Sequence, residues 1–128
     1  MRHDLLSDVL YVVNNAEKFG KKEVTVPASN LVKNVLEVIR RAGYVKSYEF
    51  IEDGKSGSLK IELAGKINQA RAIKPRFSAK TDDFEKWEAR YLPAEGFGIL
   101  IVSTPEGVMN QKEAMEKGLG GKLIAYIY

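Results

Sequence analysis

Cysteine is absent from the 128 residues, and this absence excludes disulfides, thiolate metal sites and thiol catalysis. Histidine occurs once, at His3 before the first predicted helix, so a Ser-His-Asp arrangement has no placed base. The longest apolar run, around residues 99–105, is far shorter than the roughly 18 residues that a bilayer-spanning helix needs. The N-terminus also lacks the order of a signal peptide. We therefore expect a cytoplasmic protein without membrane segment, metal, cofactor or enzymatic activity.

Hydrophobic residues make up 45% of the chain and charged residues 29%, an ordinary profile for a globular protein that is large enough to bury a core. No repeat, low-complexity run or long linker interrupts the chain, and the only plausible seam is at Ala64–Gly65. The sequence therefore predicts an α/β (α+β) protein of two small domains, residues 1–65 and 66–128.

The net charge of +3 is modest, but the positive charges are unevenly distributed. Residues 66–80 contain no acidic residue, whereas residues 81–116 carry eight acidic and three basic ones. The basic residues of this basic segment are Lys66, Arg71, Lys74, Arg76 and Lys80. Such a segment is typical of a polyphosphate-binding surface, and equally of an edge strand whose cations discourage aggregation.

The first 65 residues predict a helix-strand-helix-strand-strand unit whose apolar side is covered by the helices. The predicted elements are a helix capped by Asp4 and ended at Gly20, a strand at residues 23–26 stopped by Pro27, a helix from the Ser29 cap to residue 41, and a hairpin of residues 44–52 and 58–63. Asn14 and Asn15 interrupt the apolar stripe of the first helix, where they bond locally, which is the commoner case, or reach a partner.

The second half predicts a β-rich domain with one short helix. Residues 70–77 alternate as a strand, which Pro75 restricts to an edge of the sheet. Residues 84–91 fit a helix and a strand equally well, and the aromatic rings of Trp87 and Tyr91 serve either a small core or the stacking of bases.

The stretch at residues 98–109 is the feature around which the second domain is arranged. An apolar run there predicts a strand buried on both faces, and it ends at two hydroxyls, Ser103 and Thr104, which we expect at the surface. Asn110 then caps the short helix, and a last strand follows the glycines at residues 118–121. Those glycines let another backbone approach closely, or supply the positive φ angles of a turn.

The residues singled out in the second half form a surface with hydroxyls, closely packed glycines, an amide cap and cations. This surface has no acid–base side chain placed for catalysis. That combination favours nucleic-acid recognition over catalysis, because hydroxyls bond base edges and ribose 2′-OH groups while cations contact phosphates. A DNA-binding module and a small enzyme for a phosphorylated ligand are the alternatives. The glycine loop precedes a strand rather than opening a helix, so it supports nucleotide binding weakly.

Residues 98–109, followed by residues 112–114 and 118–126, resemble the C-terminal signature of the universal small-subunit ribosomal protein eight family. Residues 4–10 and 15–16 resemble its first helix, residues 26–29 the start of its second, and residues 73–77 and 90–94 its archaeal and eukaryotic branch. The resemblance implies a structural protein that binds directly to a helical region of the central domain of small-subunit rRNA. It also implies a role in assembling the subunit platform beside neighbouring ribosomal proteins.

The resemblance assigns direct RNA contact to Ser103 and Thr104, with Gly107 shaping their loop. Many family members have another hydroxyl where this chain has Pro105, which removes one donor. Members also often carry Lys or Arg where this chain has Asn30. The uncharged Asn30 weakens, without abolishing, a phosphate contact by the first domain. The complete set of predicted RNA-binding residues is Ser29, Asn30, Lys66, Arg71, Lys74, Arg76, Tyr91, Ser103, Thr104, Gly107, Asn110, Gly120 and Gly121.

Overall fold

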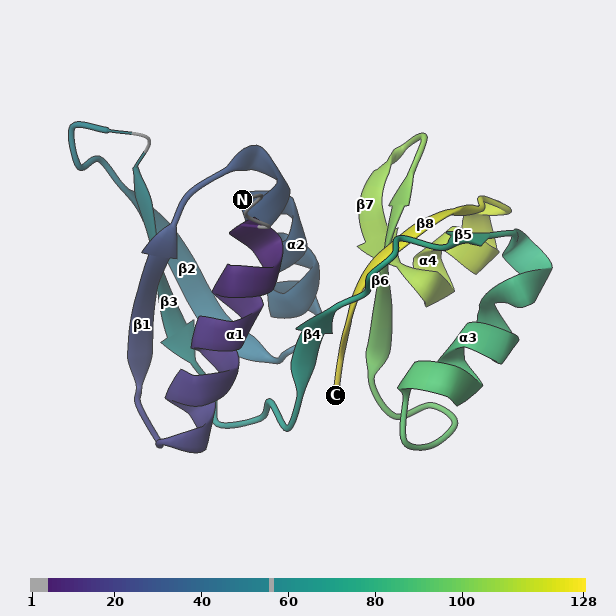
Figure 1. Cartoon of the computed structure of the whole chain (residues 1–128), viewed down its shortest axis with the longest axis horizontal. Coiled ribbons are helices and arrows are strands. Elements are labelled where there is room, and N and C mark those ends of the chain that lie inside the picture. The colour runs from purple at the N-terminus through teal and green to yellow at the C-terminus, as the bar shows by residue number, and fades with distance from the viewer. Residues whose placement is uncertain (1–4, 56) are drawn as a thin grey trace. The chain divides into compact units, whose positions relative to one another are not determined.

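The computed structural model describes residues 5–55 and 57–128, so His3 and the predicted Asp4 cap lie outside the described residues. The protein has an α+β fold that divides into two compact units, Met1–Ala70 and Arg71–Tyr128 (Figure 1). The elements are α1 (Leu5–Lys18), β1 (Glu23–Pro27), α2 (Asn30–Arg41), β2 (Val45–Ile51), β3 (Ser58–Leu63), β4 (Ala70–Ala72), β5 (Ser78–Ala79), the 3-10 turn η1 (Thr81–Asp83), α3 (Phe84–Tyr91), β6 (Ile99–Thr104), β7 (Gly107–Asn110), α4 (Gln111–Lys117) and β8 (Gly121–Ile127). None of the described helices combines the length and apolarity that crossing a bilayer requires.

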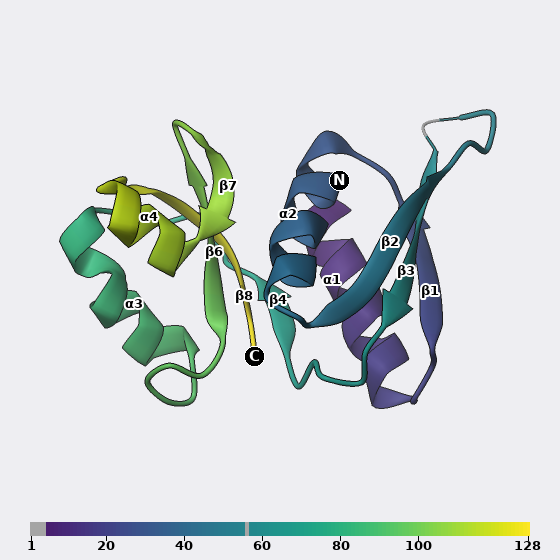
Figure 2. The same cartoon turned by 180° about the vertical axis from the view of Figure 1, so that it is seen from behind.

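The first unit is an antiparallel sheet in the order β1-β3-β2, with α1 and α2 on one face (Figures 1 and 2). Leu59, Ile61 and Leu63 of β3 are buried, and the alternate residues Lys60 and Glu62 are on the other face, as the sequence alternation predicts. The Ser29 side chain accepts a hydrogen bond from the Val32 N–H at 3.1 Å, which confirms the predicted cap of α2. The helix-strand-helix-strand-strand order is therefore confirmed.

The chain between β3 and β4 is held against α1 by two polar side chains. Asn14 donates from Nδ2 to the Ala70 carbonyl at 2.8 Å and accepts from the Ala70 N–H at 2.8 Å. Glu17 accepts from the Ile67 N–H at 3.3 Å. The expectation of local bonding is wrong for Asn14, because its amide pairs with a peptide group 56 residues away. Residues 66–70 accordingly belong to the first unit.

The second unit is built on a sheet in the order β4-β8-β6-β7, with β5 also paired to β8. Its core contains Phe84 and Trp87 of α3, Ala114 of α4 and buried residues of β6 and β8. In β6 four consecutive residues, Ile99 to Val102, are buried. Because successive side chains of a strand point to opposite faces, this confirms a strand that is buried on both sides.

Three features of the second unit differ from the prediction. Residues 70–77 do not form one strand: β4 and β5 are separate short strands beside β8, and the break falls around Pro75, which has no N–H for a ladder. Residues 84–91 are helical, so the unit contains α3 in addition to the predicted short helix α4. The sequence also gave no sign of β7, which pairs with β6 directly after the hydroxyl turn.

A polar cluster on the surface of the first unit joins α2 to β2. The Glu37 carboxylate accepts from Arg40 at 2.7 and 3.1 Å and from the Tyr48 hydroxyl at 2.9 Å. These hydrogen bonds, first that of Arg40 and then that of Tyr48, lower the pKa of Glu37 from 4.5 to about 2.

This pKa predicts an acid-dependent contribution to the stability of the first unit. The folded state binds fewer protons than the unfolded state between the two pKa values, so the contribution is present above 4.5 and is lost as the pH falls through about 2. We expect the Glu37→Gln variant to melt at a lower temperature than wild type at neutral pH, and the two melting temperatures to converge in acid. Circular dichroism melts at several pH values measure this, and a difference that is independent of pH would contradict it.

Candidate functional site

The two hydroxyls at the end of β6 have different environments. Thr104 is opposite Gly107 across the Pro105-Glu106 turn and is only 9% exposed. Its hydroxyl donates to the Gly107 carbonyl at 2.8 Å and accepts from the Glu106 N–H at 3.1 Å. Gly107 has a φ of 116°, which only glycine adopts without strain. The expectation that both hydroxyls lie at the surface is therefore wrong for Thr104, which shapes the hairpin.

Ser103, in contrast, is exposed and lies in the middle of a row of paired residues. It is opposite Lys122 of β8 on one side and Val108 of β7 on the other. Lys122 is in turn opposite Ser78 of β5. Directly opposed residues of antiparallel strands project from the same face of a sheet, so these side chains lie together. We call Ser78, Lys122 and Ser103 the hydroxyl–lysine row.

All three side chains of the hydroxyl–lysine row are exposed. Within residues 5–55 and 57–128, neither serine hydroxyl has a hydrogen-bond partner and Lys122 has no carboxylate partner. An exposed cation between two hydroxyls offers one charge for a phosphate and two groups that both donate and accept hydrogen bonds.

Gly120 and Gly121 let β8 approach its neighbours closely. A Cβ atom at Gly121 would overlap the carbonyl oxygen of Ser103, and one at Gly120 would lie 2.7 Å from the carbonyl oxygen of Ala79. Neither glycine has a positive φ; that conformation occurs at Gly118, which ends α4 at a φ of 67°. Close backbone approach, one of the two predicted uses of these glycines, is therefore the one found. It also brings Gly121 beside Ser103 of the hydroxyl hairpin.

Asn110 is the N-cap of α4, as predicted. Its Oδ1 accepts from the Glu113 N–H at 2.9 Å, so the amide oxygen serves the helix. The amide nitrogen and the second lone pair of the amide oxygen of this predicted RNA-binding residue have no hydrogen-bond partner among the described residues.

The predicted basic residues are exposed but do not share one strand. Lys66 lies in the first unit, Arg71 lies in β4, and Lys74 and Arg76 follow in the connection to β5. The simple edge-strand interpretation of the basic segment therefore applies to Arg71 alone among these four.

Tyr91 lies in a chain of stacked aromatic rings. Its ring centroid is 6.2 Å from that of Trp87 and 5.2 Å from that of Tyr126, and Arg90 lies 5.5 Å from the Tyr91 centroid. Trp87 is a core residue, which is one of the two roles that the sequence left open. The Tyr91 ring already stacks within the protein, and its partial exposure leaves a smaller surface for a base.

The remaining predicted residues, Ser29 and Asn30, lie at the start of α2 in the first unit. The Ser29 oxygen is used by the helix cap, whereas the Asn30 side chain is exposed. Their RNA-binding role stays a prediction.

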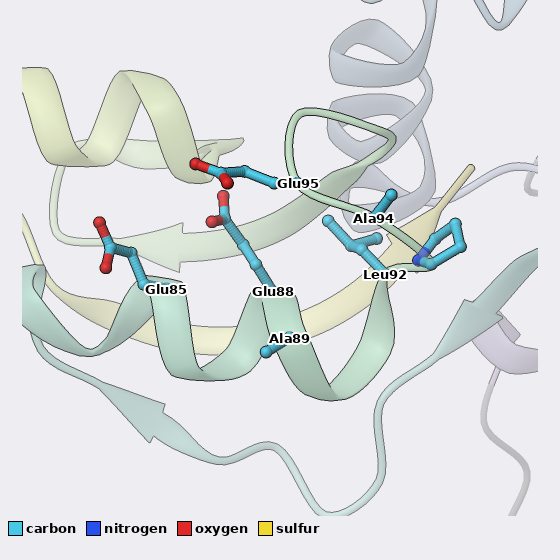
Figure 3. A pocket seen from close by; sticks show the side chains of 7 residues that line it. Glu85, Glu88, Ala89, Leu92, Ala94 and Glu95 are labelled. Atoms are coloured by element: carbon cyan, nitrogen blue, oxygen red, sulfur yellow. The ribbon is translucent and has the colours of Figure 1, made fainter.

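A hollow of the second unit lies between α3 and the loop that follows it. Its lining includes Glu85, Glu88 and Glu95, and the carboxylates of Glu88 and Glu95 point into the same space (Figure 3). Glu88 accepts from the buried Gln111 at 2.8 Å, and Gln111 accepts from the Leu100 N–H at 2.9 Å, so Glu88 and Gln111 join α3 to β6. Three carboxylates oppose a phosphorylated ligand, and this hollow does not support the enzyme alternative.

Sequence reasoning missed Ser78 and Lys122. Their position beside Ser103 follows from strand register, which links residues 19 to 44 positions apart and leaves no local signal. A β-rich unit with an exposed hydroxyl–lysine row fits the class of nucleic-acid-binding proteins.

A comparison with known protein families identifies one family within this class. A family model described as "Ribosomal protein S8" matches residues 4–128, nearly the whole chain. The chain therefore belongs to the ribosomal protein S8 family, whose members are rRNA-binding structural proteins of the small ribosomal subunit and not enzymes. This membership places the protein in the ribosome, beside other ribosomal proteins.

The difference between the two hydroxyls predicts different effects on stability. Thr104→Val removes two hydrogen bonds of the hairpin, and we expect a loss of about 1–3 kcal/mol in the free energy of unfolding. Ser103→Ala removes an exposed hydroxyl that has no partner among the described residues, and we expect it to change stability by less than about 0.5 kcal/mol. Urea unfolding curves of both variants measure this, and equal losses would contradict the assignment.

Close approach at Gly121 predicts that even a methyl group is harmful there. Gly121→Ala places its Cβ against the Ser103 carbonyl, so β8 and β6 must separate, and we expect a loss of about 1–3 kcal/mol. Lys122→Ala, a truncation of the exposed next residue, is the matched control and is expected to unfold as wild type does. If Gly121→Ala has the same free energy of unfolding as this control, the strands accommodate the methyl group without loss of stability and the prediction is wrong.

Proposed function

We propose that this chain binds directly to a helical region of the central domain of small-subunit rRNA and helps to assemble the platform of the subunit. The family resemblance supports the choice of this region. The observation that carries direct binding is the hydroxyl–lysine row, which presents two hydroxyls and a cation without partners among the described residues.

The chemistry of this row suits RNA. The minor groove of an A-form helix is wide and shallow and displays ribose 2′-OH groups, which both donate and accept hydrogen bonds. Ser103 and Ser78 are able to match either role, and Lys122 is placed for a phosphate. Since DNA lacks the 2′-OH, this arrangement predicts a preference for structured RNA over duplex DNA.

The surroundings of Ser103 support a preorganised contact. Thr104 and Gly107 hold the hairpin through their hydrogen bond, and Pro105 restricts the turn between them. The serine therefore loses little conformational freedom on binding, which favours affinity. Lys74 and Arg76 are assigned phosphate contacts that position the chain without reading sequence.

Substitutions in the row test this function. Ser103→Ala is expected to weaken binding to a transcript of the rRNA central domain by roughly 2- to 10-fold, the range of a lost hydrogen bond, with little effect on duplex DNA. Lys122→Ala is expected to weaken binding to every nucleic acid and to reduce the slope of log affinity against log salt by about 0.7–0.9, the value of one phosphate contact.

Filter binding over a range of salt concentrations measures both quantities. Lys112→Ala, which truncates an exposed lysine on α4, is the matched control and is expected to bind as wild type does. Wild-type affinity and salt slope in both row variants would refute the row as an RNA contact.

A further inference from the structure

Phe19, in the turn between α1 and β1, is the most exposed of the described large hydrophobic side chains, at 75%. A single exposed hydrophobic residue is common on protein surfaces and carries little meaning alone. The rigidity and charge of its surroundings are what distinguish this phenylalanine.

The turn is fixed by its backbone. The Gly20 N–H donates to the Glu17 carbonyl at 3.1 Å and the Lys21 N–H to the Ala16 carbonyl at 2.9 Å, with Gly20 at a φ of 72°. This is the Schellman arrangement that ends a helix. The Lys22 carbonyl then accepts from the Leu63 N–H at 2.8 Å, which ties the turn to β3.

The hydrogen bonds of this arrangement are made by the backbone and do not involve the side chain of Phe19. Gly20 is the residue in the left-handed conformation that the motif needs. In many such motifs the residue after the glycine makes a hydrophobic contact, but here that residue is Lys21. The benzyl group of Phe19 is therefore held largely in solvent, on a turn whose backbone is fixed.

Three exposed lysines flank Phe19 in the sequence: Lys18, Lys21 and Lys22. In the part of the chain that the structure describes, none of them has a carboxylate partner. The two flanking acids are engaged elsewhere: Glu17 accepts from the Ile67 N–H, and Glu23 lies 3.4 Å from Lys60. The turn is therefore a cationic site with an aromatic centre.

We propose that the turn at residues 18–22, the cationic turn, is a second RNA contact, in which Phe19 stacks on an unpaired base and the lysines contact the flanking phosphates. An aromatic ring beside cations is the usual platform for single-stranded nucleic acid, because every base has a face that stacks and every nucleotide a phosphate. A protein partner is disfavoured, since lysine is depleted at protein interfaces. The inference rests on the proposed function in taking RNA as the partner.

The ring and the lysines are tested separately, with the full chain and a transcript of the complete small-subunit rRNA. Phe19→Ala is expected to weaken binding roughly 5- to 100-fold without changing the salt slope, because stacking releases no counterions. Replacing Lys18, Lys21 and Lys22 together by alanine is expected to reduce the salt slope by about 2–3 units. Melting temperatures are expected to stay at the wild-type value in the Phe19→Ala variant.

Matched controls come from the same unit. Phe50→Ala removes another exposed ring, and Lys46→Ala with Lys55→Ala removes exposed lysines elsewhere; all are expected to bind as wild type does. Wild-type affinity in Phe19→Ala would overturn the stacking contact, and an unchanged salt slope in the lysine variant would overturn the phosphate contacts.

Ser103→Ala separates this proposal from the proposed function. If only Ser103→Ala weakens binding to the transcript, the cationic turn is refuted and the hydroxyl–lysine row stands. If only the variants of the cationic turn weaken it, the turn is supported and the Ser103 contact is refuted. The Phe19→Ala variant has one further possible outcome. If it binds RNA as wild type does but reconstituted subunits that contain it lose another ribosomal protein, the turn contacts a protein and the proposal is overturned.

Discussion

The close passage of β8 between β5 and β6 is the constraint on which the second unit depends. The two glycines at its start have no side chain to hold the neighbouring backbones apart, so the Ser103 and Ala79 carbonyls approach β8 directly. The register that results places Lys122 between Ser78 and Ser103. The same passage therefore pairs β8 with both β5 and β6 and assembles the row of groups that we assign to RNA.

The parts of the fold that local rules determine were predicted from the sequence. Ser29 and Asn110 cap their helices because a short polar side chain before a helix satisfies an N–H of the first turn. The alternation of Leu59 and Ile61 with Lys60 identifies the buried face of β3, because the period of a strand is two. Each of these signals lies within a few residues of the feature that it predicts.

The parts that depend on distant residues were not predicted. The sequence around Asn14 favours local bonding, but in the structure its amide pairs with the peptide group of Ala70, 56 residues away. Thr104 looks equivalent to Ser103, yet adjacent residues of a strand point to opposite faces, and the turn that uses the threonine hydroxyl exists only because β7 pairs with β6. Ser78 and Lys122 have no mark of function in sequence, since register alone brings them to Ser103.

The distribution of charge limits where a polyphosphate can approach the first unit. The open face of its sheet carries Glu23, Glu49 and Glu62 around Lys60, which already lies 3.4 Å from Glu23. No aromatic residue lies in these open-face rows of the described strands, so this face lacks the stacking platform of sheets that bind single-stranded RNA. Carboxylates there repel phosphates, whereas the cationic turn has three exposed cations and an exposed ring at one end of α1. Within this unit, an RNA strand is therefore directed to the turn that ends a helix, and the broad face of the sheet is left for contacts of another kind.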